Sequence, residues 1–481
     1  MFLKNFDKLL ILKIFIFFSW VAMWISINSM PGELEYMEKN IITFVNGMRT
    51  IFAVGFSSLT ILLALFYVVK KNKESKYKSL LLKIFIIYFI SQFIGLIFNQ
   101  DRSFDLNNTY LVLYAIGTIS ILYLLNIKNL DNLLPIFLYF LIFILILSII
   151  FVLIKSSDKI IFSLSQKSFY YLLHPDIAFN YQAPPRITGF ARSISIINIF
   201  LIILYLVNHK KFYSYFLISI IYFLSIMIWL AQSRGAIICF YTSTFILIFF
   251  LNNLNFFKKI IIFFIITLLA MVGSNFILSS KFVNINDIEI KKIEETDVSI
   301  DVSIDVSNNE KKTRIPNNEK SENLEKILKL KDSRFYTQRT TSGRTTLWKE
   351  SLRKYNKQII FGYGPQADRI ILDDKTNKYG NNVSNASLYA FLSGGYPSLI
   401  CIILIYLYFF YLSVKFFFNK KIYNFSFELN KNNILIISAL TFSVFFMIRS
   451  IIENSFSVFS IDFLITIFSI FIVEKENKKK I

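Results

Sequence analysis

Long apolar runs separated by short polar segments make up most of the chain. Most runs approach the roughly 20 residues that an α-helix needs to cross the hydrocarbon core of a bilayer. The runs lie near residues 9–28, 49–69, 79–98, 109–126, 133–154, 194–208, 212–232, 236–251, 260–279, 387–416, 433–450 and 456–473, and the sixth and the eighth are short. This pattern predicts an all-α polytopic membrane protein with about twelve transmembrane helices.

One long polar segment divides the runs into two groups. Residues 1–279 hold the first nine expected helices, residues 280–386 form the polar segment, and residues 387–481 hold the last three helices and a polar tail. Within the polar segment, residues 297–307 repeat an Asp-Val-Ser-Ile unit, and repeats of this kind lack the apolar content to fold. We therefore expect a disordered spacer over residues 285–320.

The later part of the polar segment, residues 331–369, carries signals of ordered structure. Ser342 is a suitable N-cap, and the glycine-rich stretch 361–365 predicts a turn. Between them, an amphipathic helix of about four turns is predicted by residues at three- and four-residue steps, namely Arg344, Leu347, Trp348, Ser351, Leu352 and Tyr355.

Composition agrees with a membrane protein. The 481 residues are 55% hydrophobic, include 54 phenylalanines and have a mean hydropathy of +0.55, which is more apolar surface than a soluble domain can hide. Both cysteines, Cys239 and Cys401, lie within apolar runs. Neither a disulfide framework nor a metal site of cysteine and histidine is therefore expected.

Charge determines the expected orientation. A net charge of +21 would indicate a nucleic-acid partner in a soluble protein. Here most lysines lie in alternate short loops and in the tail, so the positive-inside rule places those loops and both termini in the cytoplasm. Residues 280–386 then lie in the periplasm, on the outer face of the inner membrane, and we expect no nucleic-acid partner.

The arginines are distributed differently from the lysines. In this topology every arginine falls outside the membrane or at its outer edge, whereas the cytoplasmic loops use lysine alone; the arginines are residues 49, 102, 186, 192, 234, 314, 334, 339, 344, 353, 369 and 449. A guanidinium group is planar, permanently charged and able to grip phosphate oxygens in pairs, whereas lysine is a point charge. The arginines therefore indicate that chemistry takes place on the outer face.

Two positions near the outer membrane edge stand out. Arg234 lies between the seventh and eighth runs, and a charge held in hydrocarbon costs about 2.5–3.5 kcal/mol on insertion scales, so it normally has a partner or a ligand. Arg449 and Glu453 lie four residues apart on one helix face, where they can pair with each other.

Five short motifs follow one another in the second half of the chain. They are Arg186–Gly189, Ser233-Arg234-Gly235, Gly343-Arg344-x-x-Leu347-Trp348 with Gly362-x-Gly364, Asn385-x-x-Leu388 with Gly395, and Arg449-x-x-x-Glu453. In order and topology they resemble the O-antigen ligase and O-antigen polymerase family.

This resemblance implies a multi-helix membrane glycosyltransferase that works without metal or other cofactor. The implied donor is a glycan linked through pyrophosphate to a polyprenol, and an acceptor glycan and the lipid bilayer are the other expected partners, with a chain-length regulator beside a polymerase. Arg234 and Arg344 are implied to grip the pyrophosphate. Further candidates for substrate binding are Arg186, Arg192, Arg339, Asn385 and Arg449.

The chain departs from the ligases at one chemically important position. Ligases of this family usually carry His-Asn before the span that follows the long loop, where the histidine is a proposed general base; here the pair is Ser384-Asn385. The remaining candidates for a base are Glu453 and His174. Loss of the histidine favours a polymerase, which joins repeat units, over a ligase, which transfers the glycan to a lipid A core.

Two other classes of function stay open. A transporter of lipid-linked sugar would show charged or broken helices near mid-membrane, whereas the polar residues here gather at one face. In a non-catalytic assembly protein, the long loop would serve only as a docking platform. Replacing Arg234 or Arg344 separates these readings, because only an enzyme is expected to lose polymer.

Overall fold

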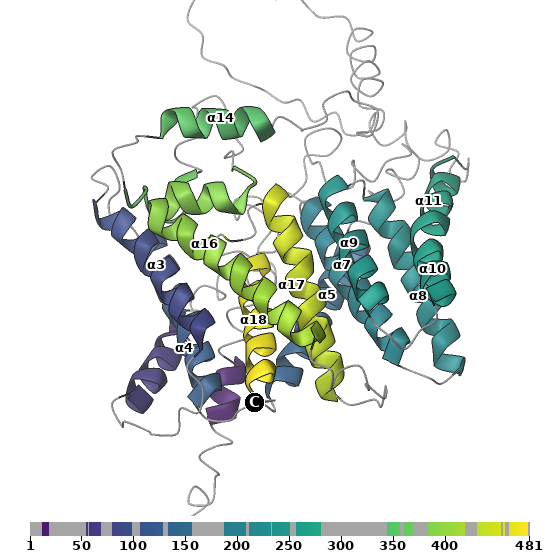
Figure 1. Cartoon of the computed structure of the whole chain (residues 1–481), viewed down its shortest axis with the longest axis horizontal. Coiled ribbons are helices and arrows are strands. Elements are labelled where there is room, and N and C mark those ends of the chain that lie inside the picture. Colours follow the sequence, from purple (N-terminus) through teal and green to yellow (C-terminus); the bar gives the residue numbers. More distant parts are fainter. Residues whose placement is uncertain are drawn as a thin grey trace, which may run out of the picture.

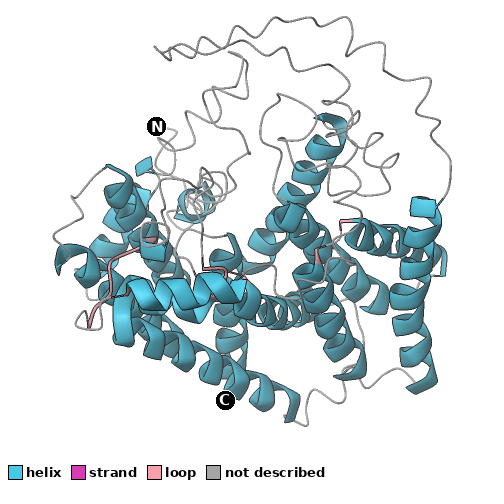
Figure 2. Ribbon diagram, turned by 90° about the horizontal axis from the view of Figure 1, so that it is seen from above, coloured by secondary structure: helices cyan, strands magenta, loops and turns pink. Residues whose placement is uncertain are grey.

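The computed structural model is mostly helical in the residues that it describes. The described residues are 12–18, 54–55, 57–68, 79–98, 106–127, 133–155, 187–207, 211–231, 233–250, 256–279, 344–355, 360–368, 383–418, 431–453, 456 and 461–479. No strand occurs within these ranges, and the view from above shows helices and connecting loops only (Figure 2). The expected spacer, residues 285–320, lies outside them.

The described parts of the predicted apolar runs are helical. The helices are α3 (Leu80–Phe98), α4 (Leu106–Ile127), α5 (Leu133–Lys155), α7 (Ile187–Val207), α8 (Lys211–Leu230), α9 (Arg234–Phe250), α10 (Phe256–Phe264), the π-helix η5 (Ile265–Leu269), α11 (Ala270–Ser279), α14 (Arg344–Lys354), α16 (Ala386–Phe418), α17 (Lys431–Ile452) and α18 (Ile461–Lys479). The all-α class is therefore confirmed.

Four of the described helices are long and apolar enough to cross a membrane. The crossing segments are Leu80–Ile97, Gly189–Leu206, Ala386–Phe416 and Ile434–Ile452, and shorter apolar helices of 10–17 residues accompany them. Helical segments suit a bilayer because they satisfy every backbone hydrogen bond internally. The larger number of about twelve spans stays a prediction.

The sixth predicted run is not short, because its helix begins earlier than expected. α7 starts at Ile187 rather than near residue 194 and contains 21 residues. In its polar first turns, the hydroxyl groups of Ser193 and Ser195 are satisfied within the helix by hydrogen bonds to the carbonyl oxygens of Gly189 and Ala191. Arg192 therefore lies on the helix and not in the preceding loop.

The C-terminal end of α18 extends beyond the apolar run into the polar tail. Glu474 is buried and accepts hydrogen bonds from the Ser79 hydroxyl at 2.5 Å and the Leu80 amide at 2.8 Å. Lys475 is also buried, and its Nζ donates to the carbonyl oxygen of Leu125 at 2.7 Å. These contacts hold the tail against α3 and α4 as a helix.

The described helices form a bundle with α17 near its centre and α14 across one end. α17 packs against α7, α9, α16 and α18, and α16 packs along α3. α14 lies over that end of the bundle, above the start of α16, while α18 ends at the opposite end (Figure 1). α14 is anchored there by Trp348, whose Nε1 donates to the Val383 carbonyl at 2.6 Å.

Candidate functional site

An ion pair connects the polar segment to the end of α17. Arg344 is the first residue of α14, and its Nη2 lies 2.8 Å from Oε1 of Glu453, which directly follows α17. The two side chains are 28% and 18% exposed, so the pair is partly accessible to solvent. The pairing of Glu453 with Arg449 that helix spacing allowed is therefore wrong, because both residues bind partners from other helices.

Arg449 instead belongs to a buried cluster with Arg192 and Asp462. Asp462, in the first turn of α18, accepts from Arg449 Nε at 2.8 Å and from Arg192 Nη1 at 2.7 Å. The Arg449 and Asp462 side chains are only 4% and 5% exposed. One carboxylate thus serves two guanidinium groups, which leaves this buried cluster with a net positive charge.

The buried cluster also has unused hydrogen-bond donors. Arg449 Nη1 and Arg192 Nε are both buried and have no hydrogen-bond partner. A buried donor without a partner costs about 1–3 kcal/mol. The cluster can therefore be stabilised further by an anion or by a rearranged carboxylate.

Asp462 was not among the residues predicted from the sequence. Its signal was present, because it is the single acidic residue within the apolar run 456–473. An ionisable residue inside a membrane segment is a functional candidate by default. Motif comparison missed it because the last motif ends at Glu453.

Arg234 lies at the start of α9, beside the same end of α17. The next residue, Gly235, packs so closely that a Cβ atom there would lie 2.7 Å from Cδ1 of Ile452, the neighbour of Glu453. A helix N-terminus carries a partial positive charge, which adds to the guanidinium charge of Arg234. The start of α9, with Arg234, and the start of α14, with Arg344, therefore both meet the same end of α17, although they lie far apart in sequence.

Asn385 connects α16 to this end of α17. Its Oδ1 accepts from the Leu388 amide at 2.8 Å, which caps the helix, and its Nδ2 donates to the Ile451 carbonyl at 2.9 Å. Ser384, in the position where ligases usually carry histidine, precedes it with a positive φ of 45°. The asparagine motif thus positions the start of α16 beside Glu453.

The glycine motifs form a junction between the loop after α14 and a break in α16. Gly395 interrupts α16 with a φ of 63°, and a Cβ atom there would lie 1.7 Å from the Ile360 carbonyl oxygen. The amides of Tyr363 and Gly364 donate to the carbonyls of Leu392 and Ser393, both at 2.8 Å. The predicted turn over 361–365 is confirmed, and only glycine fits its contact with α16.

The structure does not describe every predicted site residue. Arg186, Arg339 and His174 lie outside the described residues. The predicted helix after Ser342 is confirmed as α14, which has 11 residues and therefore about three turns. Within the described part of the chain, no group of three or more His, Cys, Asp or Glu side chains is arranged to hold a metal.

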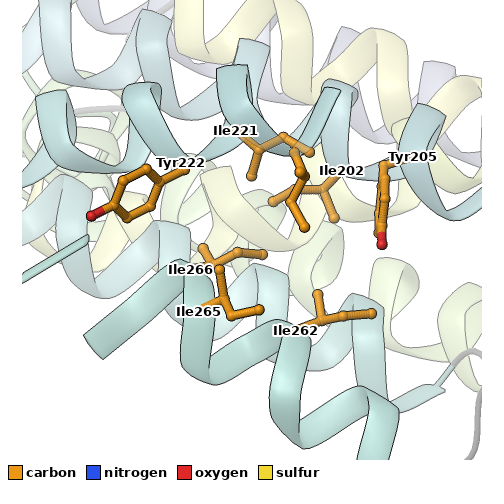
Figure 3. Close-up of a pocket in the computed structure, with 8 residues that line it drawn as sticks. Ile202, Tyr205, Ile221, Tyr222, Ile262, Ile265 and Ile266 are labelled. Atoms are coloured by element: carbon orange, nitrogen blue, oxygen red, sulfur yellow. The ribbon is translucent and has the colours of Figure 1, made fainter. Parts of the chain in front are cut away.

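An apolar pocket lies away from these arginines, between α7, α8 and the region of α10 and η5. Six isoleucines and two tyrosines line it: Ile202, Tyr205, Ile218, Ile221, Tyr222, Ile262, Ile265 and Ile266 (Figure 3). It offers no ionisable group other than the tyrosine hydroxyls, so acid–base chemistry is not expected there.

At the end of α17, positive charge exceeds negative charge. In the described ion pairs, three guanidinium groups, those of Arg192, Arg344 and Arg449, bind two carboxylates, those of Asp462 and Glu453. These pairs are partly or fully buried, where electrostatic interactions are stronger than in water. Guanidinium groups in such a setting suit an anionic ligand such as a phosphate group.

The comparisons with known proteins agree with the sequence motifs. Residues 217–403 match the model of a family described as O-antigen ligase. No curated protein and no solved structure matches the chain. The matched segment includes Arg234, Arg344, Asn385 and Gly395, and it ends before α17. The resemblance to the O-antigen ligase family is thus confirmed for this segment of the chain.

Proposed function

We propose that the protein transfers an oligosaccharide from a polyprenyl diphosphate carrier to an acceptor glycan on the outer face of the inner membrane, as a surface-polysaccharide polymerase. The family supports a glycan-transferring role in general. The observation that carries the specific proposal is the pair of Arg344 and Glu453 beside the cluster of Arg192, Arg449 and Asp462, because guanidinium groups outnumber carboxylates in these described ion pairs.

The diphosphate of the donor supplies negative charge for these guanidinium groups. A diphosphate diester carries about two negative charges, and guanidinium groups grip phosphate oxygens in pairs. Arg344 and Arg234 bind the phosphate oxygens. The positive charges of Arg192 and Arg449, which lie farther from the ligand, strengthen the electrostatic attraction. As the donor is cleaved, these groups stabilise the charge that develops on the leaving diphosphate.

The reaction requires one bond to form and one to break at the anomeric carbon. An acceptor hydroxyl oxygen bonds to that carbon, while the bond from the carbon to the diphosphate oxygen breaks and its electron pair leaves with the polyprenyl diphosphate. Glu453 takes the proton of the acceptor hydroxyl. Its carboxylate becomes available because Arg344 exchanges Glu453 for the diphosphate.

The acceptor decides between polymerase and ligase. Ser384 stands where ligases usually carry histidine, and Asn385 beside it is used for helix capping and for contact with α17. A polymerase extends the glycan on a lipid carrier, whereas a ligase transfers it to a lipid A core. The departure at Ser384 favours the polymerase.

A transporter of the same lipid-linked sugar is the second candidate, because α16 is broken at Gly395 and broken helices are common in transporters. The break is, however, docked against the loop after α14 through backbone hydrogen bonds and packed against α3. A transporter would move the donor without lengthening the glycan.

The test uses purified full-length protein in liposomes with the polyprenyl diphosphate-linked repeat unit from cells that make it. Arg344→Ala and Arg234→Ala should each lower polymer formation by about 10²–10³-fold, as expected for loss of one group that stabilises a developing negative charge. Gel separation of the glycans should then show single repeat units.

The matched control is Arg353→Ala, which removes an exposed arginine from the same helix as Arg344. It should retain the glycan pattern of the unmodified protein. Normal polymer lengths from Arg344→Ala would overturn the proposal. Transport of donor across the liposome membrane without lengthening would indicate the second candidate, and product found only on added lipid A core would indicate a ligase.

A further inference from the structure

A cluster of aromatic side chains lies at the end of α14 that is farther from Arg344. Tyr355 contacts Phe391 with ring centroids 4.6 Å apart and Tyr363 with centroids 5.5 Å apart. Phe391 in turn contacts Tyr396 edge-to-face at 5.2 Å. We name these four residues the tyrosine cluster.

Within the tyrosine cluster, the exposure of the side chains increases from Tyr355 to Tyr396. Tyr355 is 5% exposed, packs in a small core with Val383 and fixes the position of the other rings. Tyr363 and Phe391 are partly buried, and Tyr396 is 55% exposed. The cluster therefore presents aromatic surface to its surroundings on a rigid base.

The break in α16 positions the exposed ring. Tyr396 directly follows Gly395, whose positive φ ends the first turns of α16, and the Tyr396 amide donates to the Ile360 carbonyl at 3.2 Å. A continuous α-helix would direct this side chain elsewhere, since each residue would be rotated by a regular step. The same glycine junction that docks the loop thus also places Tyr396 beside Phe391.

The tyrosines of the cluster influence one another electrostatically. Burial, and to a smaller extent the neighbouring Tyr363 and Tyr396, raise the pKa of Tyr355 to about 12. At neutral pH the Tyr355 hydroxyl is therefore protonated and able both to donate and to accept a hydrogen bond. Flat apolar rings bordered by hydroxyl groups form a surface that offers both apolar packing and hydrogen bonds.

We propose that the tyrosine cluster binds a sugar ring of the glycan, at a distance of several sugars from the diphosphate. A pyranose ring has a face of C–H groups, which packs on an aromatic ring, and an edge of hydroxyl groups, which hydrogen-bond to tyrosine hydroxyls. This inference rests on the proposed function, because Arg344 is taken to hold the diphosphate.

The length of α14 sets the distance between Arg344 and the tyrosine cluster. Eleven helical steps separate Arg344 from Tyr355, which corresponds to about 16 Å at 1.5 Å per residue. A glycan that starts at Arg344 and follows α14 would reach the cluster with a later sugar of the repeat unit. The cluster would thus recognise glycan length rather than the diphosphate.

Two donors test the inference in the liposome assay: the polyprenyl diphosphate carrying the complete repeat unit, and the same carrier bearing only its first sugar. Tyr396→Ala should raise KM for the complete donor about fivefold, on the scale of one aromatic contact. It should leave the rate of cleavage of the one-sugar donor unchanged. Tyr396→Phe keeps the ring and should show a smaller increase in KM.

The control is Tyr215→Ala, which removes a tyrosine that is 72% exposed on α8. If exposed tyrosines only anchor the protein at the membrane interface, both alanine variants should behave alike, which would overturn the inference. Equal losses with both donors would show that Tyr396 is structural and would also overturn it. Arg344→Ala should impair both donors, so failure of the subsite and failure of the proposed function give different results.

Discussion

At the residue scale, Asp462 shows how a membrane protein can bury two arginine side chains by pairing both with one carboxylate. Arg449 and Asp462 are almost completely buried, and Arg192 shares the same carboxylate from α7. Desolvating three charged groups is costly, and removing one member of such a set leaves the others without compensation. Asp462 therefore stabilises the position of both guanidinium groups behind the proposed diphosphate site.

Replacing Asp462 with asparagine should destabilise the protein by about 3–5 kcal/mol, because two buried positive charges lose their counter-ion. The measurement is the free energy of unfolding in mixed micelles with increasing denaturing detergent. The control is Glu350→Gln, which breaks the pair of Glu350 and Lys354 one turn apart on α14, where both side chains are 27–31% exposed. That change should cost less than about 1 kcal/mol, and equal effects from both variants would refute the role of Asp462.

At the element scale, the break in α16 changes the direction of the helix and also docks the loop that follows α14. Gly395 lets the first turns of α16 leave the direction of the long helix, and the backbone there accepts and donates hydrogen bonds with the loop that follows α14. From α3, Gly95 contributes to the same junction, since a Cβ atom there would lie 2.4 Å from the Phe361 carbonyl oxygen. Three elements thus meet through backbone atoms, which only glycine permits.

Gly395→Ala should undock the loop, because the new Cβ atom would overlap the Ile360 carbonyl oxygen and the backbone conformation is unfavourable for alanine. The expected cost is about 3 kcal/mol or more, together with loss of polymer in the liposome assay. Gly55→Ala is the matched control, because a Cβ atom there has nothing within 4 Å. Retention of both stability and polymer formation in Gly395→Ala would contradict the glycine junction.

At the scale of the whole molecule, the two ends of the bundle differ in what they carry. α14 and the arginine site lie at one end, and the lysine-rich end of α18 lies at the other (Figure 1). The positive-inside rule places the lysine-rich end in the cytoplasm and α14 outside. The proposed chemistry requires this orientation, because surface polysaccharide is assembled on the outer face.

Cysteine labelling tests the orientation directly. In right-side-out membrane vesicles, Lys349→Cys on the exposed side of α14 should react with a membrane-impermeant thiol reagent. Glu476→Cys, near the end of α18, should react only after the vesicles are opened. The natural Cys239 and Cys401 are buried and should give little background. The reverse labelling pattern would place α14 in the cytoplasm and exclude the proposed function.

Local patterns predicted the type and approximate position of the described helices, although not the first turns of α7 or the extension of α18. Apolar runs predicted membrane helices because a bilayer leaves the helix as the means for a single segment to satisfy its own backbone. The three- and four-residue spacing after Ser342 predicted α14, and the glycine-rich stretch predicted the turn after it. Arginine in place of lysine indicated phosphate chemistry, since that preference belongs to the side chain itself.

The tertiary structure alone decided the partners. Arg449 and Glu453 were neighbours by spacing, yet Glu453 pairs with Arg344, which is 109 residues away, and Arg449 pairs with Asp462. Arg192 reaches the same aspartate across 270 residues. Ion-pair choice depends on which helix ends meet, and that is fixed by packing over the whole bundle and not by any local pattern. The sequence by itself therefore determined where the described helices form and suggested the proposed chemistry, and the fold determined which charges face one another.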